Sequence, residues 1–252
     1  MREMRLSSDR VQSKRDQSAD PGPATAAAVD GRFYQVARPG SIGEWVAIKA
    51  RDQIYSDFLR LCAPSEHDTI LDVGVSDVIT DAANAVECLY PYPERITAVG
   101  LGEGGGFRAA YPSVRYRQVE ADAALPFPDR AFDIAISNAV LEHVGSVEAQ
   151  ARLIRELWRV ASRVFITVPH RYFPVEHHSG VPLAHWLDST FRVACGLLNR
   201  PEWAQAENLI LMSRRRLARL VPRTDGQAPS LGYAGLRLGP FSSNLFLYMQ
   251  AR

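Results

Sequence analysis

The stretch "TILDVGVSDVITDAAN" (residues 69–84) decides the fold prediction, because a strand-like apolar run leads into a turn and then into a helix-like pattern. In α/β proteins this succession presents backbone N–H groups at the carboxyl end of a strand, where ligands bind. The turn holds one glycine, Gly74, whereas nucleotide-binding turns usually hold two or three. The stretch therefore predicts a ligand site of modified form.

The same alternation of strands and helices continues on both sides of this stretch. Apolar residues recur at helical spacing over residues 45–61 and 147–161. Short apolar runs typical of buried strands occupy residues 69–73, 95–101, 114–119, 132–137 and 164–168. Strands that alternate with helices indicate an α/β fold with a parallel sheet and right-handed crossovers.

The segment after the fifth predicted strand is less regular. Residues 169–188, "PHRYFPVEHHSGVPLAHWLD", are too rich in Pro, His and aromatic residues for a regular element. A loop of this length inside a compact domain is usually functional. Beyond it we expect helices at residues 189–198 and 201–220, then a turn and a final strand within residues 235–250.

Composition sets the expected domain organisation and disfavours some partners. The chain has 252 residues, of which 46% are hydrophobic, enough for one substantial core. Residues 1–31 mix both charge signs with Ser, Gln, Pro and Ala, so we expect a disordered tail ahead of one domain, residues 32–252. The net charge of +1 does not favour nucleic acid as a partner. Three widely spaced cysteines suit a reducing compartment, so we predict a cytoplasmic protein.

A second glycine cluster, "GLGEGG" (residues 100–105), offers a rival interpretation. It matches the dinucleotide fingerprint G-x-G-x-x-G and follows a predicted strand, which would indicate a nicotinamide-dependent oxidoreductase. However, Pro112 leaves too few residues for the helix that should hold the pyrophosphate and cross over to the next strand. Chain length therefore disfavours the dinucleotide interpretation.

The strongest motif is "ALPFPDRAFDIAISNAVLEHV" (residues 124–144), in which a Pro-rich turn precedes a strand, Asn138 and a Glu-His pair. The order of motifs over residues 68–185 resembles the class I S-adenosylmethionine-dependent methyltransferases, particularly the small bacterial enzymes that act on lipids, quinones and glycans. This resemblance implies a Rossmann-like, mostly parallel seven-stranded sheet with an antiparallel last strand. It also implies S-adenosylmethionine as the cofactor.

The resemblance places cofactor-binding residues at the carboxyl ends of successive strands. They would be Asp72, Gly74 and Ser76 beneath the methionine part, Gly100, Leu101 and Glu103 at the ribose, Asp122 and Ala123 at the adenine, and Asn138 over the cofactor. Two departures from the family pattern stand out. The third and fourth positions of D-x-G-x-G-x-G are Ser76 and Val78, and the acidic residue at the end of the second strand is Gly100. Glu103 could supply the missing acceptor for the ribose hydroxyls.

Histidines supply the candidate proton acceptors. His143 follows the fourth predicted strand, where an acceptor should approach, and imidazole titrates in the useful range. His177 and His178 in the 169–188 loop are further catalytic candidates. Alternatively, His143 only packs a turn. A metal site is not expected, because the adjacent His177 and His178 would point in different directions.

The same loop is predicted to form the acceptor pocket. Its candidate substrate-binding residues are Arg171, Tyr172, His185 and Trp186. A loop pinned to the core by its aromatic residues is the alternative. Downstream, "LMSRRRLARLVPR" (residues 211–223) has the pattern of a basic amphipathic helix, either simply solvated or in peripheral contact with a membrane or an anionic acceptor.

Together these features predict S-adenosylmethionine-dependent methyl transfer, most simply to an oxygen of a small-molecule, lipid-linked or glycan acceptor. Two alternatives stay open at this stage. One is a catalytically silent interaction module that keeps the methyltransferase fold, which the thinned glycine turn favours. The other is the nicotinamide-dependent oxidoreductase.

Overall fold

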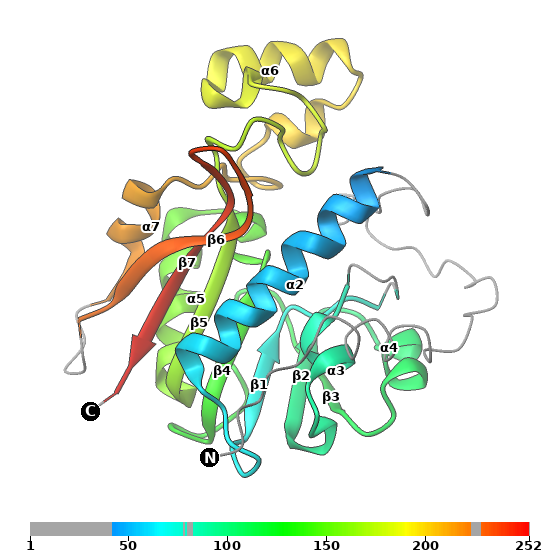
Figure 1. Ribbon diagram of the computed structural model, residues 1–252, viewed down its shortest axis with the longest axis vertical. Coiled ribbons are helices and arrows are strands. Elements are labelled where there is room, and N and C mark those ends of the chain that lie inside the picture. Colours follow the sequence, from blue (N-terminus) through cyan, green and yellow to red (C-terminus); the bar gives the residue numbers. More distant parts are fainter. Residues whose placement is uncertain (1–41, 78, 80–82, 223–227, 252) are drawn as a thin grey trace.

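Seven strands form one sheet in the computed structural model, which describes residues 42–77, 79, 83–222 and 228–251 (Figure 1). The strands are β1 (Ile70–Val73), β2 (Ile96–Gly100), β3 (Arg115–Gln118), β4 (Phe132–Asn138), β5 (Ala161–Pro169), β6 (Ser230–Leu238) and β7 (Phe241–Gln250). Their order in the sheet is β3-β2-β1-β4-β5-β7-β6. The order reverses between β1 and β4, so a ligand site is expected at the carboxyl ends of these two strands.

The strand directions confirm a mostly parallel sheet with an antiparallel last strand. β1 pairs in parallel with β2 and β4, β2 pairs in parallel with β3, and β4 pairs in parallel with β5. β7 runs antiparallel to both of its neighbours, β5 and β6. The prediction of a single final strand was incomplete, because β6 begins at Ser230 and forms a hairpin with β7.

Helices cover both faces of the sheet, as expected when alternate strand residues point to opposite sides. The long helix α2 (Ile42–Cys62) crosses one face and α5 (Val147–Val160) lies on the other (Figure 1). Within β1, Ile70 packs into the core beneath α2, whereas Leu71 packs into the core beneath α5. The short helices α3 (Ala85–Leu89) and α4 (Gly105–Ala110) follow β1 and β2.

The prediction of one helix over residues 201–220 was wrong. The 3-10 helix η4 (Pro201–Ala204) and α7 (Arg214–Leu220) are separated by an irregular segment. Within it the N–H of Ile210 donates to the carbonyl of Glu142, and the carbonyl of Met212 accepts from the N–H of Arg171. The second half of this segment therefore bonds to neighbouring loops rather than continuing as a helix.

A small lobe lies beyond the carboxyl ends of the parallel strands (Figure 1). It contains α6 (Asp188–Leu197), the 3-10 helix η3 (Ala184–Trp186) and η4. The lobe has its own apolar cluster, made of Phe191, Cys195, Trp203 and Leu209. Helix α6 confirms the expected helix at residues 189–198 to within a residue at each end. Among the described residues, no helix combines the length and apolar character needed to cross a membrane.

Candidate active site at the carboxyl ends of the strands

The turn after β1 has room for glycine alone at its first position. Gly74 has φ +95°, and a Cβ built on it would lie 2.2 Å from Val140 Cγ2. The N–H groups of Gly74 and Val75 both donate to the carbonyl of Val99 in β2, at 2.8 and 3.2 Å. The turn is thereby tied to β2 and covered by the segment that follows β4.

Ser76 is buried and held by one side chain. Its N–H donates to Asn84 Oδ1 and its carbonyl accepts from Asn84 Nδ2, both at 2.9 Å. Among the described residues that follow this turn, the first helix, α3, begins at Ala85. Val78, the last position of the glycine motif, lies outside the described residues.

Asp77 connects the first turn to the loop after β2. Its Oδ1 accepts the N–H of Phe107 in the first turn of α4 at 2.8 Å. α4 spans only six residues, which agrees with the argument that the 100–105 cluster lacks the long helix of a dinucleotide site.

Two buried carboxyl groups lie at the end of β1. Burial raises the pKa of Asp72 to about 7, and burial together with the charge of Asp72 raises the pKa of Glu87 well above its usual range. A cationic group bound here would lower both pKa values.

The end of β2 explains the missing acidic residue. A Cβ on Gly100 would lie 2.9 Å from Tyr116 Oη and 3.1 Å from the carbonyl oxygen of Val75, so a carboxylate side chain does not fit there. The following residue, Leu101, is 54% exposed, and Glu103 is also exposed. Leu101 and Glu103 therefore present an exposed apolar side chain and an exposed carboxylate one and three residues after Gly100.

The remaining predicted cofactor residues differ in their surroundings. Asp122 and Ala123 are exposed beyond β3, and Asp122 forms a 3.4 Å ion pair with Arg152. Asn138 ends β4, and its Oδ1 accepts a hydrogen bond of 2.5 Å from Thr167 Oγ1 in β5. Asn138 therefore fixes the point at which the chain leaves β4 for the next turn.

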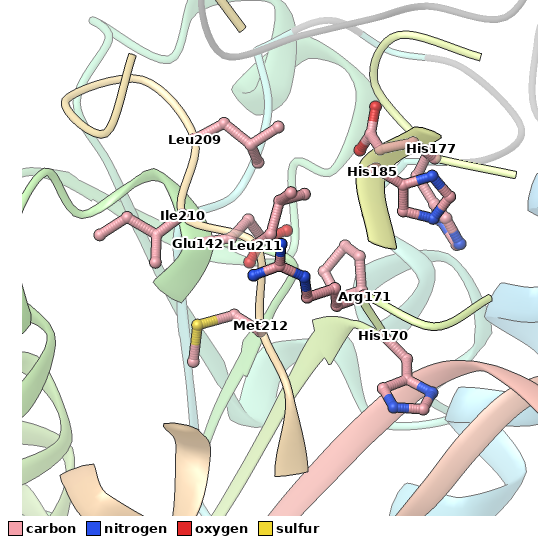
Figure 2. Close-up of a pocket in the computed structure, with 11 residues that line it drawn as sticks. Glu142, His170, Arg171, His177, His185, Leu209, Ile210, Leu211 and Met212 are labelled. Carbon is pink, nitrogen blue, oxygen red and sulfur yellow. The ribbon is translucent and has the colours of Figure 1, made fainter. Parts of the chain in front are cut away.

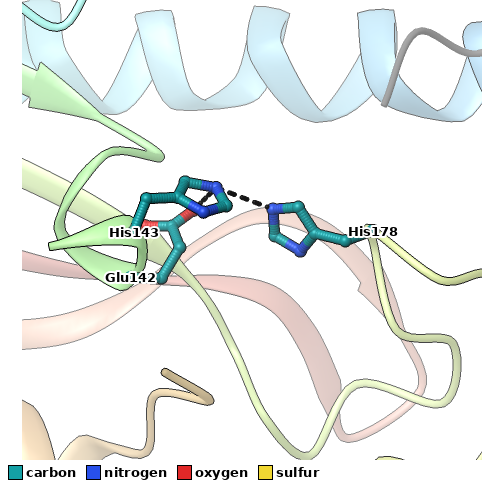
Figure 3. A group of neighbouring side chains, drawn as sticks. All are labelled: Glu142, His143 and His178. Carbon is teal, nitrogen blue, oxygen red and sulfur yellow. Dashed lines mark hydrogen bonds and ion pairs between the residues drawn. The ribbon is translucent and has the colours of Figure 1, made fainter. Parts of the chain in front are cut away.

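That turn brings His143 to His178. His143 lies in the 3-10 helix η2 (Leu141–His143), and its Nε2 is 3.1 Å from Nε2 of His178 in the loop after β5 (Figure 3). The two rings meet edge to face with centroids 4.7 Å apart. Each histidine side chain is 10% exposed.

Each histidine of this pair is oriented through its other nitrogen. His143 Nδ1 is 2.8 Å from the carbonyl oxygen of Asn208, and His178 Nδ1 is 2.8 Å from Glu176 Oε1. A carbonyl oxygen only accepts, so Nδ1 of His143 carries a hydrogen. An ionised carboxylate also only accepts, so Nδ1 of His178 carries a hydrogen as well.

The electrostatics of the site follow from burial and from Glu176. Although burial opposes it, the charge of His178 and hydrogen bonds from His178 and Ser179 hold the pKa of Glu176 well below its usual range. Burial acts against the charged form of His178, but the carboxylate of Glu176 raises its pKa. Burial and the charge of His178 lower the pKa of His143 to about 4. Burial raises the pKa of Glu142 to about 7.

A small cavity lies between η2, the loop after β5 and residues 209–212 (Figure 2). Glu142, Arg171, His177 and His185 are among the residues that line it. His185 is buried, and its Nε2 bonds to the carbonyl of Phe173 at 2.8 Å. His185 therefore joins two points of the loop, and its predicted role in acceptor binding stays a prediction.

The other predicted acceptor residues lie around the same loop. Arg171 pairs with Asp188 at 2.6 Å, Tyr172 is 45% exposed, and the ring of Trp186 packs on Phe241 with centroids 5.7 Å apart. Their roles in acceptor binding stay predictions. Sequence reasoning did not assign a role to Glu176 or Asn208, because no local motif marks residues that contact His143 and His178 only through the fold.

Comparisons with known proteins agree with this geometry. Residues 72–163 match a family model described as a methyltransferase domain. The methyltransferase domain of bacterial CtHen1-CN is similar in structure, with a TM-score of 0.51, 12% identity, and coverage of 81% of this chain and 99% of that one. PigF with SAH gives a TM-score of 0.51 and 14% identity over 82% of this chain and 65% of that one. A SAM-dependent methyltransferase from Methanosarcina mazei gives a TM-score of 0.48 and 15% identity over 75% of this chain and 94% of that one.

At such identities the structural likeness concerns the fold, and the family assignment depends on the matching domain model. No curated protein matches the chain. The sheet order is that of the Rossmann-like methyltransferase fold, and residues 72–163 match a methyltransferase domain. These findings support S-adenosylmethionine-dependent methyl transfer, with S-adenosylmethionine as the cofactor.

The residues present at the strand ends fit this cofactor. Exposed Leu101 offers an apolar surface to a flat base, and exposed Glu103 offers acceptors to hydroxyl groups. The carboxyl group of Asp72, raised in pKa by burial, suits a cationic ligand group. The first turn offers fewer backbone N–H donors to the cofactor than the family pattern implies, because the N–H groups of Gly74, Val75 and Ser76 are already bonded within the chain.

Proposed function

We propose that this methyltransferase acts on a hydroxyl oxygen of a small-molecule, lipid-linked or glycan acceptor. The observation that carries the proposal is the contact between His143 Nε2 and His178 Nε2, 3.1 Å apart, just after β4. A hydroxyl loses its proton when its oxygen is methylated, and imidazole is the side chain best suited to accept one near neutral pH. His143 follows β4, one of the two strands between which the sheet order reverses, where substrates of α/β enzymes approach, and His178 reaches it from the loop after β5.

S-adenosylmethionine supplies an electrophilic methyl group, so the protein has to align the acceptor, exclude water and take up the proton. When both histidines are neutral, each presents an unprotonated Nε2 to the other, because each Nδ1 carries the hydrogen. One proton from the acceptor hydroxyl can then be held between the two Nε2 atoms. The buried carboxylate of Glu176 stabilises the resulting positive charge on His178.

The lobe limits access of water to this pair. The ring of Trp203, from the lobe's own apolar cluster, has its centroid 5.2 Å from that of His178 and 6.4 Å from that of His143. An acceptor reaching the pair would therefore be partly enclosed. Enclosure favours alignment of the reacting groups and suppresses hydrolysis.

The outer surface of the lobe supports a lipid-linked acceptor. Helix α6 carries a shallow apolar groove lined by Ser189, Thr190, Val193, Ala194 and Leu197. Leu197 is 83% exposed and Val193 is 63% exposed, so this face presents apolar area to its surroundings. Helix α7, which packs against α5 and β6 rather than in the lobe, buries Leu217 and Leu220 and exposes Arg214, Arg215 and Arg219, which suits an anionic surface. We propose peripheral membrane contact through this lobe.

The proposed location is the cytoplasm. Cys62 and Cys195 are buried free thiols. This arrangement suits a reducing compartment.

The proposal is tested by transfer of labelled methyl groups from S-adenosylmethionine to a panel of phenols, quinols, sugars and lipid-linked glycans. We expect the label on oxygen. His143→Ala should reduce turnover far more than it reduces the affinity for S-adenosylhomocysteine, measured by calorimetry, and the exposed-histidine control His67→Gln should change neither. Equal losses in turnover and affinity would make His143 a binding residue. Label on nitrogen or carbon would contradict the assignment to oxygen.

A further inference from the structure

Three side chains from two separate segments direct one ligand atom each into a common space (Figure 3). Glu142 and His143 come from η2, and His178 comes from the loop after β5. Their ligand atoms all lie within 4.8 Å of one another. We propose that Glu142, His143 and His178 bind a divalent transition-metal ion, and that zinc is the ion this ligand set fits.

The tautomers of the two histidines support the proposal. Asn208 and Glu176 accept the Nδ1 hydrogens of His143 and His178, so in the neutral state of both rings two Nε2 lone pairs face each other over 3.1 Å. Such an arrangement needs a positive centre between the nitrogens. A shared proton or a metal ion could be this positive centre. The third side chain distinguishes the proton from the metal ion.

That third side chain is Glu142, whose side chain is 1% exposed. Among the described residues, neither of its carboxyl oxygens has a hydrogen-bond partner. Its Oε1 lies 4.0 Å from Nε2 of His143. An unpartnered buried carboxyl is costly, and one proton shared between the histidines leaves it without a bond. A metal ion bound by all three side chains removes this cost.

The distances suit a metal after a small adjustment. Tetrahedral zinc with ligands about 2.0–2.1 Å from the ion places neighbouring ligand atoms about 3.3–3.4 Å apart. The two Nε2 atoms are already at 3.1 Å, and the Glu142 oxygen is 4.0 Å from His143 Nε2. Because all three ligand atoms lie within 4.8 Å of one another, the carboxyl group needs to move toward the two histidines by no more than about 1.5 Å.

The surroundings also match those of metal sites. A histidine that binds a metal usually donates its other ring N–H to a carboxylate or a backbone carbonyl, which fixes the tautomer. Glu176 supplies the carboxylate for His178 and Asn208 supplies the carbonyl for His143. Glu176 is itself fixed by the N–H groups of His178 and Ser179 and by the hydroxyl of Ser179.

Two imidazoles and one carboxylate leave an open coordination position, as in catalytic zinc sites. The metal-binding inference uses the same two histidines as the proposed proton acceptor, but it is tested separately from methyl transfer. In the metal-loaded protein the two Nε2 atoms are ligands rather than bases, and the ion would instead lower the pKa of an acceptor hydroxyl that reaches it, with the proton passing to solvent. His143 and His178 are 35 positions apart in the sequence, which explains why local histidine spacing did not indicate the site.

The experiment is a titration of the full chain, stripped of metal with a chelator, with Co²⁺ and then with Zn²⁺, in the absence of cofactor and acceptor. We expect one Co²⁺ per chain, ligand-field bands in the visible spectrum, and their loss when Zn²⁺ displaces Co²⁺. His178→Ala and Glu142→Gln should each weaken binding by about 100-fold or more, and Glu176→Gln by about 10- to 100-fold. The control His67→Gln removes an exposed histidine and should leave binding unchanged.

Absence of the visible bands, or equal affinity in the wild type and in Glu142→Gln, would overturn the proposal. Glu142→Gln keeps the side-chain volume, so its Co²⁺ affinity tests the proposal even if His178→Ala fails to fold. Because no cofactor or acceptor is present, failure to bind metal leaves the methyl-transfer test untouched. Conversely, metal binding without oxygen methylation would overturn only the proposed acceptor chemistry.

Discussion

Gly74→Ala gives the sharpest test of the first turn. In the structure an added Cβ would lie 2.2 Å from Val140 Cγ2, 3.0 Å from Cγ1 and 3.2 Å from Cβ, and φ is +95°. Holding a residue other than glycine at such a backbone angle costs about 1–3 kcal/mol. Forcing a methyl group into an occupied space costs about another 1–3 kcal/mol. We therefore expect Gly74→Ala to lower the free energy of unfolding by about 2–6 kcal/mol.

The two contributions separate in a double-mutant cycle with Val140→Ala. Removing the Val140 methyl groups should relieve the steric cost but leave the backbone cost, so the cycle should give a coupling of about 1–3 kcal/mol. Urea denaturation of the four proteins measures it. Calorimetry with S-adenosylhomocysteine would report the accompanying loss of cofactor affinity. A change below about 0.5 kcal/mol for Gly74→Ala, or no coupling to Val140, would refute the reasoning.

Three further predictions concern other parts of the chain. Burial and Asp72 raise the pKa of Glu87 in the folded state above 4.5, so its contribution to stability is present below pH 4.5 and is lost as the pH rises through the folded-state pKa. The stability of Glu87→Gln relative to the wild type should therefore increase from pH 4 to pH 8 in denaturation experiments, and a constant difference would contradict this. Asn84→Ala should cost about 2–3 kcal/mol by urea denaturation, because it frees both backbone groups of buried Ser76; a loss within 0.5 kcal/mol would show that solvent replaces these bonds. The wild type should sediment more with anionic than with neutral liposomes, and Leu197→Glu should weaken this without lowering stability; equal sedimentation with both lipids would leave the basic face merely solvated.

Strand positions and the sheet could be predicted because buried parallel strands are short continuous apolar runs. The run at residues 132–137 became β4, and Asn138 stands at its end as expected. The first residue of β5 was harder to predict from the sequence. It starts at Ala161, directly after α5, and its first residues lack the apolar pattern seen from Val164 onward.

The candidate site was predicted only in part, because its contacts join distant segments. His143 was found from its place after β4, and His178 from the composition of the loop. Their contact, and the orienting role of Asn208, depend on how the lobe folds back over the sheet. The same folding explains the wrong helix at residues 201–220, since tertiary hydrogen bonds of Ile210 outweigh the helical spacing of its apolar neighbours.

The separate apolar cluster of the lobe has a consequence for dynamics. Four residues form a small cooperative unit, which should open at a lower free energy than the sheet and exchange its amide hydrogens sooner. Trp203 belongs to that unit and also stacks near His178, so each opening would uncover the imidazoles and alter indole emission together. The fluorescence of Trp203 should therefore report local opening of the lobe.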